Sequence, residues 1–144
     1  MTNAAFATAC EGFIDGSIDL DTATIKAAFV RGYTFVSSHR FVSDVTGAGG
    51  TLNGTSAALS GKSVTNGVFD AAATSASTSA SAVNHGVLLF QSSAVAGGSD
   101  VAASAQRVIA YLDSGTGLPI QPGTGTTNIT WDTGASKIFK VATA

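Results

Sequence analysis

The stretch Leu59–Asp70, LSGKSVTNGVFD, gives the clearest local indication of the fold. The dipeptide Asn66-Gly67 near its end accepts the positive backbone φ angles that a type I′ turn requires, and residues of alternating character precede it. The chain from residue 57 to residue 73 is therefore predicted to contain a β-hairpin.

Outward from this hairpin, three segments have the character of strands. In Thr24–Val30, apolar side chains at every second position predict a strand with one buried face. The apolar run Val87–Phe90 predicts a central strand, and Arg107–Leu112 predicts a further strand with two distinct faces.

The C-terminal part of the chain predicts a second hairpin. Two strand-like segments, Asn128–Trp131 and Lys137–Val141, flank the turn-forming residues Asp132–Ala135. Trp131 alternates with Ile129 on one face, which favours a core anchor or an interface residue over a ligand platform.

Helical structure is predicted at two places. Residues 3–15 form the one clear helix, within an N-terminal helical segment 1–16, with Thr2 or Asn3 as its cap and Gly16 as a left-handed end. Its apolar positions fall on one helical face: Phe6, Cys10, Phe13 and Ile14. The thiol on this face is therefore expected to be buried and inert. Ser37–Val42 predicts a single capped helical turn.

Small residues dominate two segments, 71–84 and 92–105, which are predicted to be low-complexity loops. The first of them leaves two structures open: a strand of small side chains that runs into a mobile loop, or a surface laid against another backbone. Pro119 and Pro122 are expected to keep residues 118–125 extended and outside a central ladder, because proline lacks an N–H donor.

Together these elements predict a mainly β, single-domain protein, a β-sandwich or small β-barrel with a short N-terminal helix. The chain has 144 residues, which is the size of one domain, so residues 1–144 are expected to fold as a unit.

Charge is sparse, at 11% of residues with a formal net charge of −2, and the seven basic residues are dispersed. Nucleic-acid binding is not expected, because it needs several cations on one face. No stretch approaches the roughly 20 apolar residues that span a bilayer, so no membrane partner is expected. The N-terminus has no signal-peptide pattern, and a single cysteine fits synthesis in a reducing cytoplasm.

The sequence carries no catalytic, cofactor or metal motif, so no enzyme activity is predicted. Asp15, Asp19 and Asp21 lie close together, but their spacing fails the EF-hand pattern and favours a solvated turn. His39 and His85 have no zinc-like spacing, and no nucleophile-elbow motif marks a serine. A hydrolase or carbohydrate-active domain would need paired carboxylates across a cleft, and the acids lie mostly in turns.

Four segments are more distinctive than their chemistry explains. They are Ser17–Thr22 with Thr24–Lys26, Leu59–Lys62 with Asn66-Gly67, Arg107–Asp113 with Thr116–Pro119, and Ile129–Asp132 with Gly134 and Lys137–Phe139. In this order they resemble a family of small virion proteins encoded among the structural genes of tailed bacteriophages.

The resemblance implies a capsid decoration (cement) protein that is made in the host cytoplasm and binds the major capsid protein on the outside of the head. It implies no catalytic residues and no cofactor. A homotrimer at local threefold positions of the shell would match the symmetry of those sites. The alternative is a tail or head-fibre component involved in adsorption, for which Tyr33, Phe35 and Tyr111 are the aromatic candidates.

Overall fold

The computed structural model describes residues 3–80 and 83–141. Two helices are present, α1 (Ala7–Asp15) and α2 (Val42–Gly47). The strands are β1 (Ala4–Ala5), β2 (Thr24–Arg31), β3 (Thr51–Thr55), β4 (Ser63–Thr65), β5 (Val68–Asp70), β6 (Thr74–Thr78), β7 (Gly86–Ser93), β8 (Arg107–Leu112), β9 (Gly125–Ile129) and β10 (Phe139–Lys140). The chain is mainly β with a short N-terminal helix, which confirms the predicted fold class.

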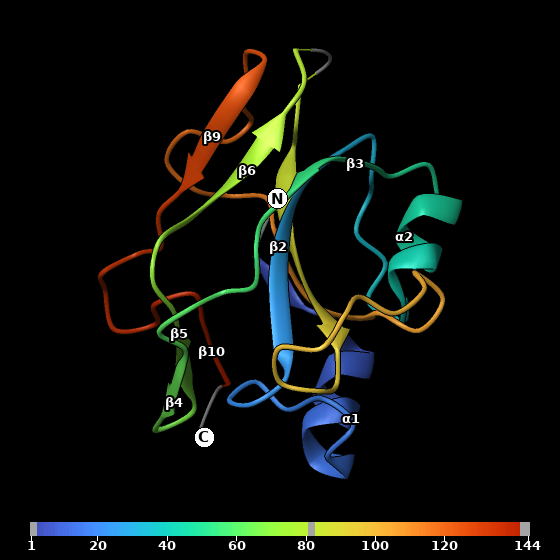
Figure 1. The fold of residues 1–144 in the computed structure, drawn as a ribbon, viewed down its shortest axis with the longest axis vertical. Helices are drawn as coiled ribbons and strands as arrows, with labels where there is room; N and C mark the ends of the chain where they lie inside the picture. Colours follow the sequence, from blue (N-terminus) through green and yellow to red (C-terminus); the bar gives the residue numbers. More distant parts are fainter. Residues whose placement is uncertain (1–2, 81–82, 142–144) are drawn as a thin grey trace.

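An antiparallel sheet with the strand order β1-β8-β7-β2-β3 forms the centre of the molecule (Figure 1). All eight residues of β7 are buried, and β2 is buried on both faces. Strands that are covered on both sides read as continuous apolar runs rather than as alternation. The predicted strands 24–30, 87–90 and 107–112 are confirmed.

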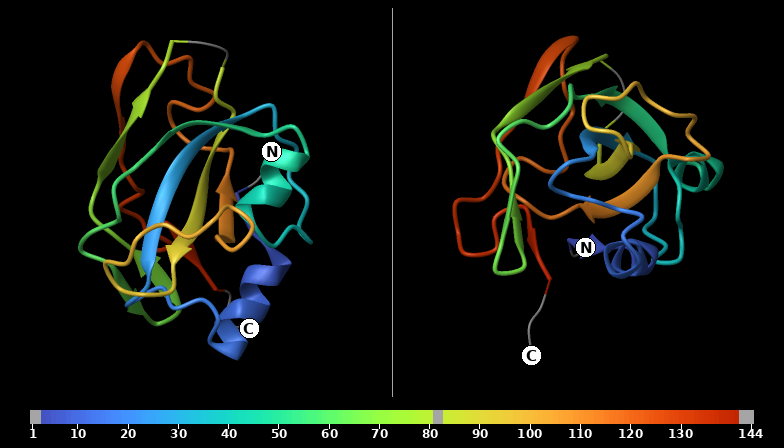
Figure 2. Two further views of the ribbon diagram at one scale, coloured as in Figure 1. Left: turned by 45° about the vertical axis from the view of Figure 1, so that its right-hand side comes forward. Right: turned by 60° about the horizontal axis from the view of Figure 1, so that its bottom comes forward.

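Beyond β3 the strands curl around the core instead of ending at an open edge. An isolated bridge joins Ser56 to Ala76 of β6, and β6 pairs with β9. The two-stranded sheet β6-β9 thus continues the curl of the five-stranded sheet through this bridge, and the two sheets form a small barrel-like domain that is not closed (Figure 2). Within the described residues, β9 and the β8–β1 end are not paired with each other, and they leave a seam between them.

A smaller sheet, β10-β5-β4, contains the predicted hairpin. Asn66 and Gly67 have φ angles of 52° and 75°, as a type I′ turn requires, and Thr65 pairs with Val68 across the turn. This hairpin is confirmed, although its strands are shorter than the predicted segment.

The second predicted hairpin is wrong. The strand at 125–129 pairs with β6, and Phe139 pairs with Phe69 of β5. A hydrogen-bonded turn lies between the two segments, at Gly134–Lys137, but it does not pair them with each other. Trp131 donates a 3.0 Å hydrogen bond from its Nε1 to the carbonyl of Ala72. The two strands therefore pair with earlier strands of the chain, β9 with β6 and β10 with β5, and not with each other.

The helix α1 begins later than predicted, and its buried face is a different one. Thr8, Ala9 and Gly12 are buried, whereas Cys10 is exposed and Ile14 is 88% exposed. The helix lies too close to its neighbours for large side chains, since a Cβ on Gly12 would lie 2.7 Å from the Ile18 side chain. The predicted burial of the Cys10 thiol is therefore wrong.

The ends of α1 give a mixed result. Gly16 has a φ of 75° and closes the helix as predicted. Phe6 occupies the N-cap position without a side-chain cap, so the cap predicted at Asn3 is wrong; Thr2, the other candidate, lies outside the described residues. Asn3 instead accepts a hydrogen bond from the N–H of Ser114.

The predicted helical turn at 37–42 is also wrong, because α2 begins where that segment ends. The Asp44 carboxylate accepts hydrogen bonds of 2.8 and 2.9 Å from the N–H groups of Arg40 and Phe41, which hold the chain at the start of the helix. These bonds lower the pKa of Asp44 below its usual value.

The segments predicted as low-complexity loops are only partly loops. Residues 74–78 form β6, a strand of small side chains laid against β9, and residues 81–82 lie outside the described part. Of the segment 92–105, the first two residues extend β7 and the rest is loop. The connection that carries Pro119 and Pro122 lies outside the sheets, as predicted, apart from one bridge at Ile120.

Tyr33 and Tyr111 provide a matched test of hydrogen bonding in the core. Both side chains are buried, and their rings make an edge-to-face contact with the ring centroids 5.2 Å apart. The Tyr33 hydroxyl bonds His39 Nδ1 at 2.9 Å and accepts from the N–H of Val36, whereas the Tyr111 hydroxyl has no partner among the described residues. Burial raises the pKa of Tyr111 to about 12.

We expect Tyr33→Phe to lower the free energy of unfolding by about 1 kcal/mol, because it leaves a backbone N–H without its acceptor. Tyr111→Phe removes a hydroxyl that gains nothing in the folded state, so it should leave stability unchanged or raise it. Urea denaturation of the two variants measures the difference. Equal losses in both would contradict the assigned hydrogen bonds.

Candidate docking surfaces

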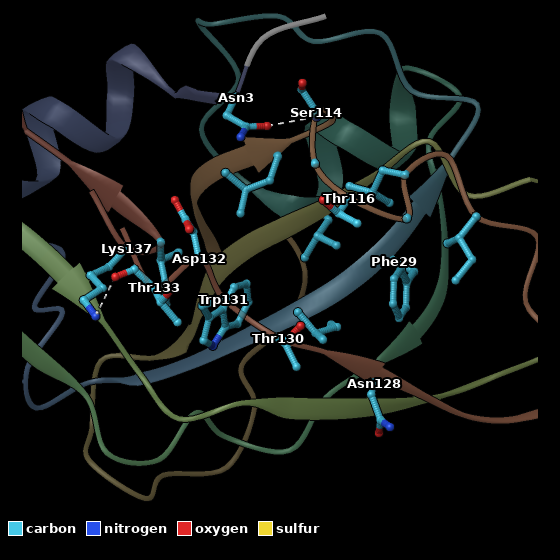
Figure 3. A pocket seen from close by; sticks show the side chains of 18 residues that line it. Asn3, Phe29, Ser114, Thr116, Asn128, Thr130, Trp131, Asp132, Thr133 and Lys137 are labelled. Atoms are coloured by element: carbon cyan, nitrogen blue, oxygen red, sulfur yellow. Dashed lines mark hydrogen bonds between the residues drawn. The ribbon is translucent and has the colours of Figure 1, made fainter. Parts of the chain in front are cut away.

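The seam of the barrel forms a groove with a volume of about 760 Å³ between β9 and the loop that follows β8 (Figure 3). Apolar side chains from β2, β7, the ends of β8 and β9, and the residue just before β10 line its interior: Phe29, Val87, Leu112, Ile129 and Ile138. Polar side chains line its rim, among them Asn3, Asn128, Thr130 and Asp132. We call this hollow the seam groove.

Hydrogen bonds within the chain hold the rim of the seam groove in place. Asn3 Oδ1 accepts from the N–H of Ser114 at 2.9 Å, which fixes the loop after β8. Asp132 Oδ1 accepts from the N–H of Gly134 at 3.1 Å. Lys137 Nζ lies 3.4 Å from the carbonyl oxygen of Thr133. The groove is therefore shaped before any partner arrives.

The seam groove is nearly neutral. Its titratable lining residues are Asp132 and Lys137, and the ammonium of Lys137 also lies 3.8 Å from the Asp70 carboxylate. The remaining polar groups are hydroxyls, amides and backbone atoms. Such a lining binds through hydrogen bonds and apolar contact, and it suits an uncharged ligand.

The backbone edge of β9 borders the seam groove. Among the described strands, β9 pairs only with β6, and Asn128, Ile129 and Thr130 line the groove on the opposite side. In Figure 3 this strand runs along one wall, with Thr130 and Trp131 at the groove. An unpaired strand edge presents a regular row of N–H and C=O groups.

A second surface lies at the end of the molecule where α1 meets the β4–β5 hairpin, near the bottom of Figure 1. An apolar groove of about 370 Å³ is present there, lined by Phe13, Ile18, Leu20, Val64, Phe69, Phe139 and Val141. Phe13 and Phe139 stack with ring centroids 6.1 Å apart.

Two of the side chains that line this groove are about half exposed, Val64 (49%) and Val141 (48%). Ile14, which follows Phe13 in α1, is 88% exposed. We call these residues, together with Phe13 and Phe139, the apolar end face.

Asp19 and Asp21 also line this groove, and the carboxylates of Asp15 and Asp19 bond within the turn after α1. Asp19 accepts from the N–H groups of Asp21 and Thr22 and from the Thr22 hydroxyl, and Asp15 accepts from the N–H of Ser17. These bonds lower the pKa values of Asp19 and Asp15. This arrangement is the solvated turn that the sequence favoured. Within residues 3–80 and 83–141, no three His, Cys, Asp or Glu side chains are grouped as a metal site.

Each of the two histidines contacts a different group of the chain. His39 contacts the Tyr33 hydroxyl, and His85 Nδ1 lies 3.5 Å from the N–H of Gly32. The aromatic candidates for an adsorption surface, Tyr33 and Tyr111, are buried, and Phe35 packs between Phe6 and Tyr111.

Sequence reasoning did not find either surface. The seam groove is formed by residues from six separate segments, and its polar residues lie in no motif. The apolar end face was missed because Ile14 was predicted to face the core. Alternation along the hairpin gave no signal for Val64, because all three residues of β4 are exposed and Val64 pairs with the buried Phe69.

No protein-family model, no curated protein and no solved structure matches this chain. Of the described residues, no helix has the length and apolar character needed to cross a membrane.

Proposed function

We propose that this protein is a structural virion protein that decorates the outside of a phage head and binds the major capsid protein. The observation that carries the proposal is the apolar end face, where an apolar groove lies among exposed valine and isoleucine side chains. Apolar side chains grouped in this way mark surfaces that are covered by another protein. The resemblance of the four sequence segments to tailed-phage virion proteins supplies the class of partner.

The chemistry of the apolar end face suits permanent attachment. Fully burying an exposed valine or isoleucine side chain stabilises a complex by roughly 1.5–3 kcal/mol. Val64 and Val141 are about half exposed, so each would contribute about half of that, while Ile14 is 88% exposed. Of the two aspartates that line the groove, Asp19 accepts hydrogen bonds within its own turn, and Lys62, just before β4, donates to the carbonyl of Ala23. The exposed Asp21 carboxylate would have to stay solvated or receive a donor from the partner.

The homotrimer at local threefold positions is part of this proposal, since a cyclic assembly matches the symmetry of such sites. A tail or fibre role in adsorption is less well supported. The two tyrosines that would have provided its recognition surface are buried in the core.

The proposal is tested with head particles that lack this protein, from the phage whose genome encodes it. Ile14→Lys combined with Val64→Lys should reduce binding to the particles at least about tenfold, because each lysine places a charge in the apolar contact. Lysine also suits the last turn of α1, so the fold should be kept. Co-sedimentation gives the bound fraction.

Val101→Lys is the matched control, because Val101 is 41% exposed in the loop after β7 and lies outside the apolar end face. It should bind as the unmodified protein does. Cryo-electron microscopy of decorated particles then gives location and copy number. Unchanged binding of the double variant, or a few copies at the tail, would overturn the proposal.

A further inference from the structure

We propose that the seam groove receives an extended, uncharged segment of a partner polypeptide, which adds as a strand to the free edge of β9. The identity of the partner as the shell protein rests on the proposed function. The mode of binding rests on the groove itself.

The backbone of β9 provides the first argument. In an antiparallel pair, every second residue directs both its N–H and its C=O toward the neighbouring strand, and the residues between them direct theirs away. Within Thr126–Ile129, the outward groups have no backbone hydrogen-bond partner in the part of the chain that the structure describes. Of these residues, Asn128 and Ile129 line the groove, which is already formed, so a strand added there would satisfy their outward groups.

The interior of the groove provides the second argument. A strand placed beside β9 would direct alternate side chains inward, onto Phe29, Val87 and Ile138. The other side chains would face the rim, where Asn128 and Thr130 are exposed. The fitting segment therefore alternates apolar and small polar residues, and β9 sets its length at about five residues, or roughly 17 Å.

The charge of the lining provides the third argument. Asp132 and Lys137 both already have partners within the chain, and the rest of the rim is neutral. A charged segment would lose solvation without a matching counter-charge. Because the rim is held by hydrogen bonds, little ordering is required of this protein when a segment binds.

The seam groove and the apolar end face are neighbours along the C-terminal segment. Ile138 lines the seam groove, while Phe139 and Val141 line the end groove. A shell protein seated on the apolar end face could therefore extend a segment of its chain into the seam.

The test uses the intact protein, labelled with ¹⁵N, and the synthetic peptide acetyl-Thr-Val-Thr-Val-Thr-amide. The expected result is a set of chemical-shift changes confined to residues 126–132 and the groove lining. A copy of the peptide that is N-methylated at every amide has lost its N–H donors, and it should bind at least about tenfold more weakly. Thr130→Lys should weaken binding of the parent peptide, while Ser99→Lys should not.

Equal binding of the two peptides, or shift changes away from β9, would overturn the inference. So would shift changes in the groove with cellotetraose and none with the peptide, which would indicate a glycan site. Since this probe contains no shell protein, its failure is separate from that of the proposed function. Loss of particle binding through the apolar end face would still support decoration if the peptide did not bind.

Discussion

Replacing Gly54 with alanine is expected to lower the free energy of unfolding by about 3 kcal/mol or more. Gly54 has a φ of 98°, a conformation that costs other residues on the order of 1–3 kcal/mol. A Cβ there would also overlap the carbonyl oxygen of Ser77 and approach Cγ2 of Thr78 at 3.1 Å. The backbone of β6 would have to move, which adds roughly 1–3 kcal/mol.

Gly54 lies where β3 contacts β6, so its replacement tests whether these two strands are in close contact. Gly47→Ala is the matched control: no atom lies within 4 Å of a Cβ added there, and its φ is not in the left-handed region. Alanine at the end of α2 should leave stability unchanged or raise it by up to about 1 kcal/mol. Urea denaturation measures both variants, and a loss below about 1 kcal/mol in Gly54→Ala would show that β3 and β6 are not in close contact.

Replacing Phe90 with alanine is expected to lower the free energy of unfolding by about 3–5 kcal/mol. Phe90 is 2% exposed in the middle of β7, where it pairs with Lys26 on one side and Val108 on the other. Removing the ring leaves a cavity in the most buried strand of the sheet, which cannot collapse without disturbing both neighbouring strands.

Domains are usually stable by about 5–15 kcal/mol, so the loss in Phe90→Ala can prevent folding altogether. The milder variant Phe90→Leu is therefore measured as well. The leucine variant should lose less than about half as much, because it keeps most of the buried volume. Val101→Ala, at a 41% exposed position, should change stability by less than about 0.5 kcal/mol. Similar losses at positions 90 and 101 would contradict the assigned core.

The two proposals explain the unpaired edge of β9 and the exposed apolar side chains in the same way, as surfaces that contact another chain. A strand edge with unpaired backbone groups and a cluster of exposed apolar side chains both favour association with other chains. Here the edge of β9 borders a groove with an apolar interior, and the exposed side chains surround a second groove. The particle and peptide experiments test the two surfaces independently.

Local sequence signals predicted the elements whose structure depends on a few neighbouring residues. Asn66-Gly67 dictates its own turn because both residues tolerate positive φ, and Gly16 ends α1 for the same reason. The apolar runs in β7 and β8 could be assigned as strands because any fold must cover them.

The predictions that failed depended on which surface each element would meet. The spacing of Phe6, Cys10, Phe13 and Ile14 correctly predicted a helix, although Phe6 precedes it as the N-cap. It does not show that Gly12 lies so close to Ile18 that α1 buries its small residues instead. Likewise, nothing local to Phe139 indicates that the exposed edge of β5 is a better partner than the segment before it.

The sequence alone thus determined the class of fold, the Asn66-Gly67 turn, the end of α1 at Gly16 and the central strands, because these follow from backbone preferences and from the burial of apolar runs. Tertiary structure alone decided the face that α1 buries, the partners of β9 and β10, and the two docking surfaces. Those features arise where segments distant in sequence meet, and the energy of such contacts depends on distances that no local pattern records.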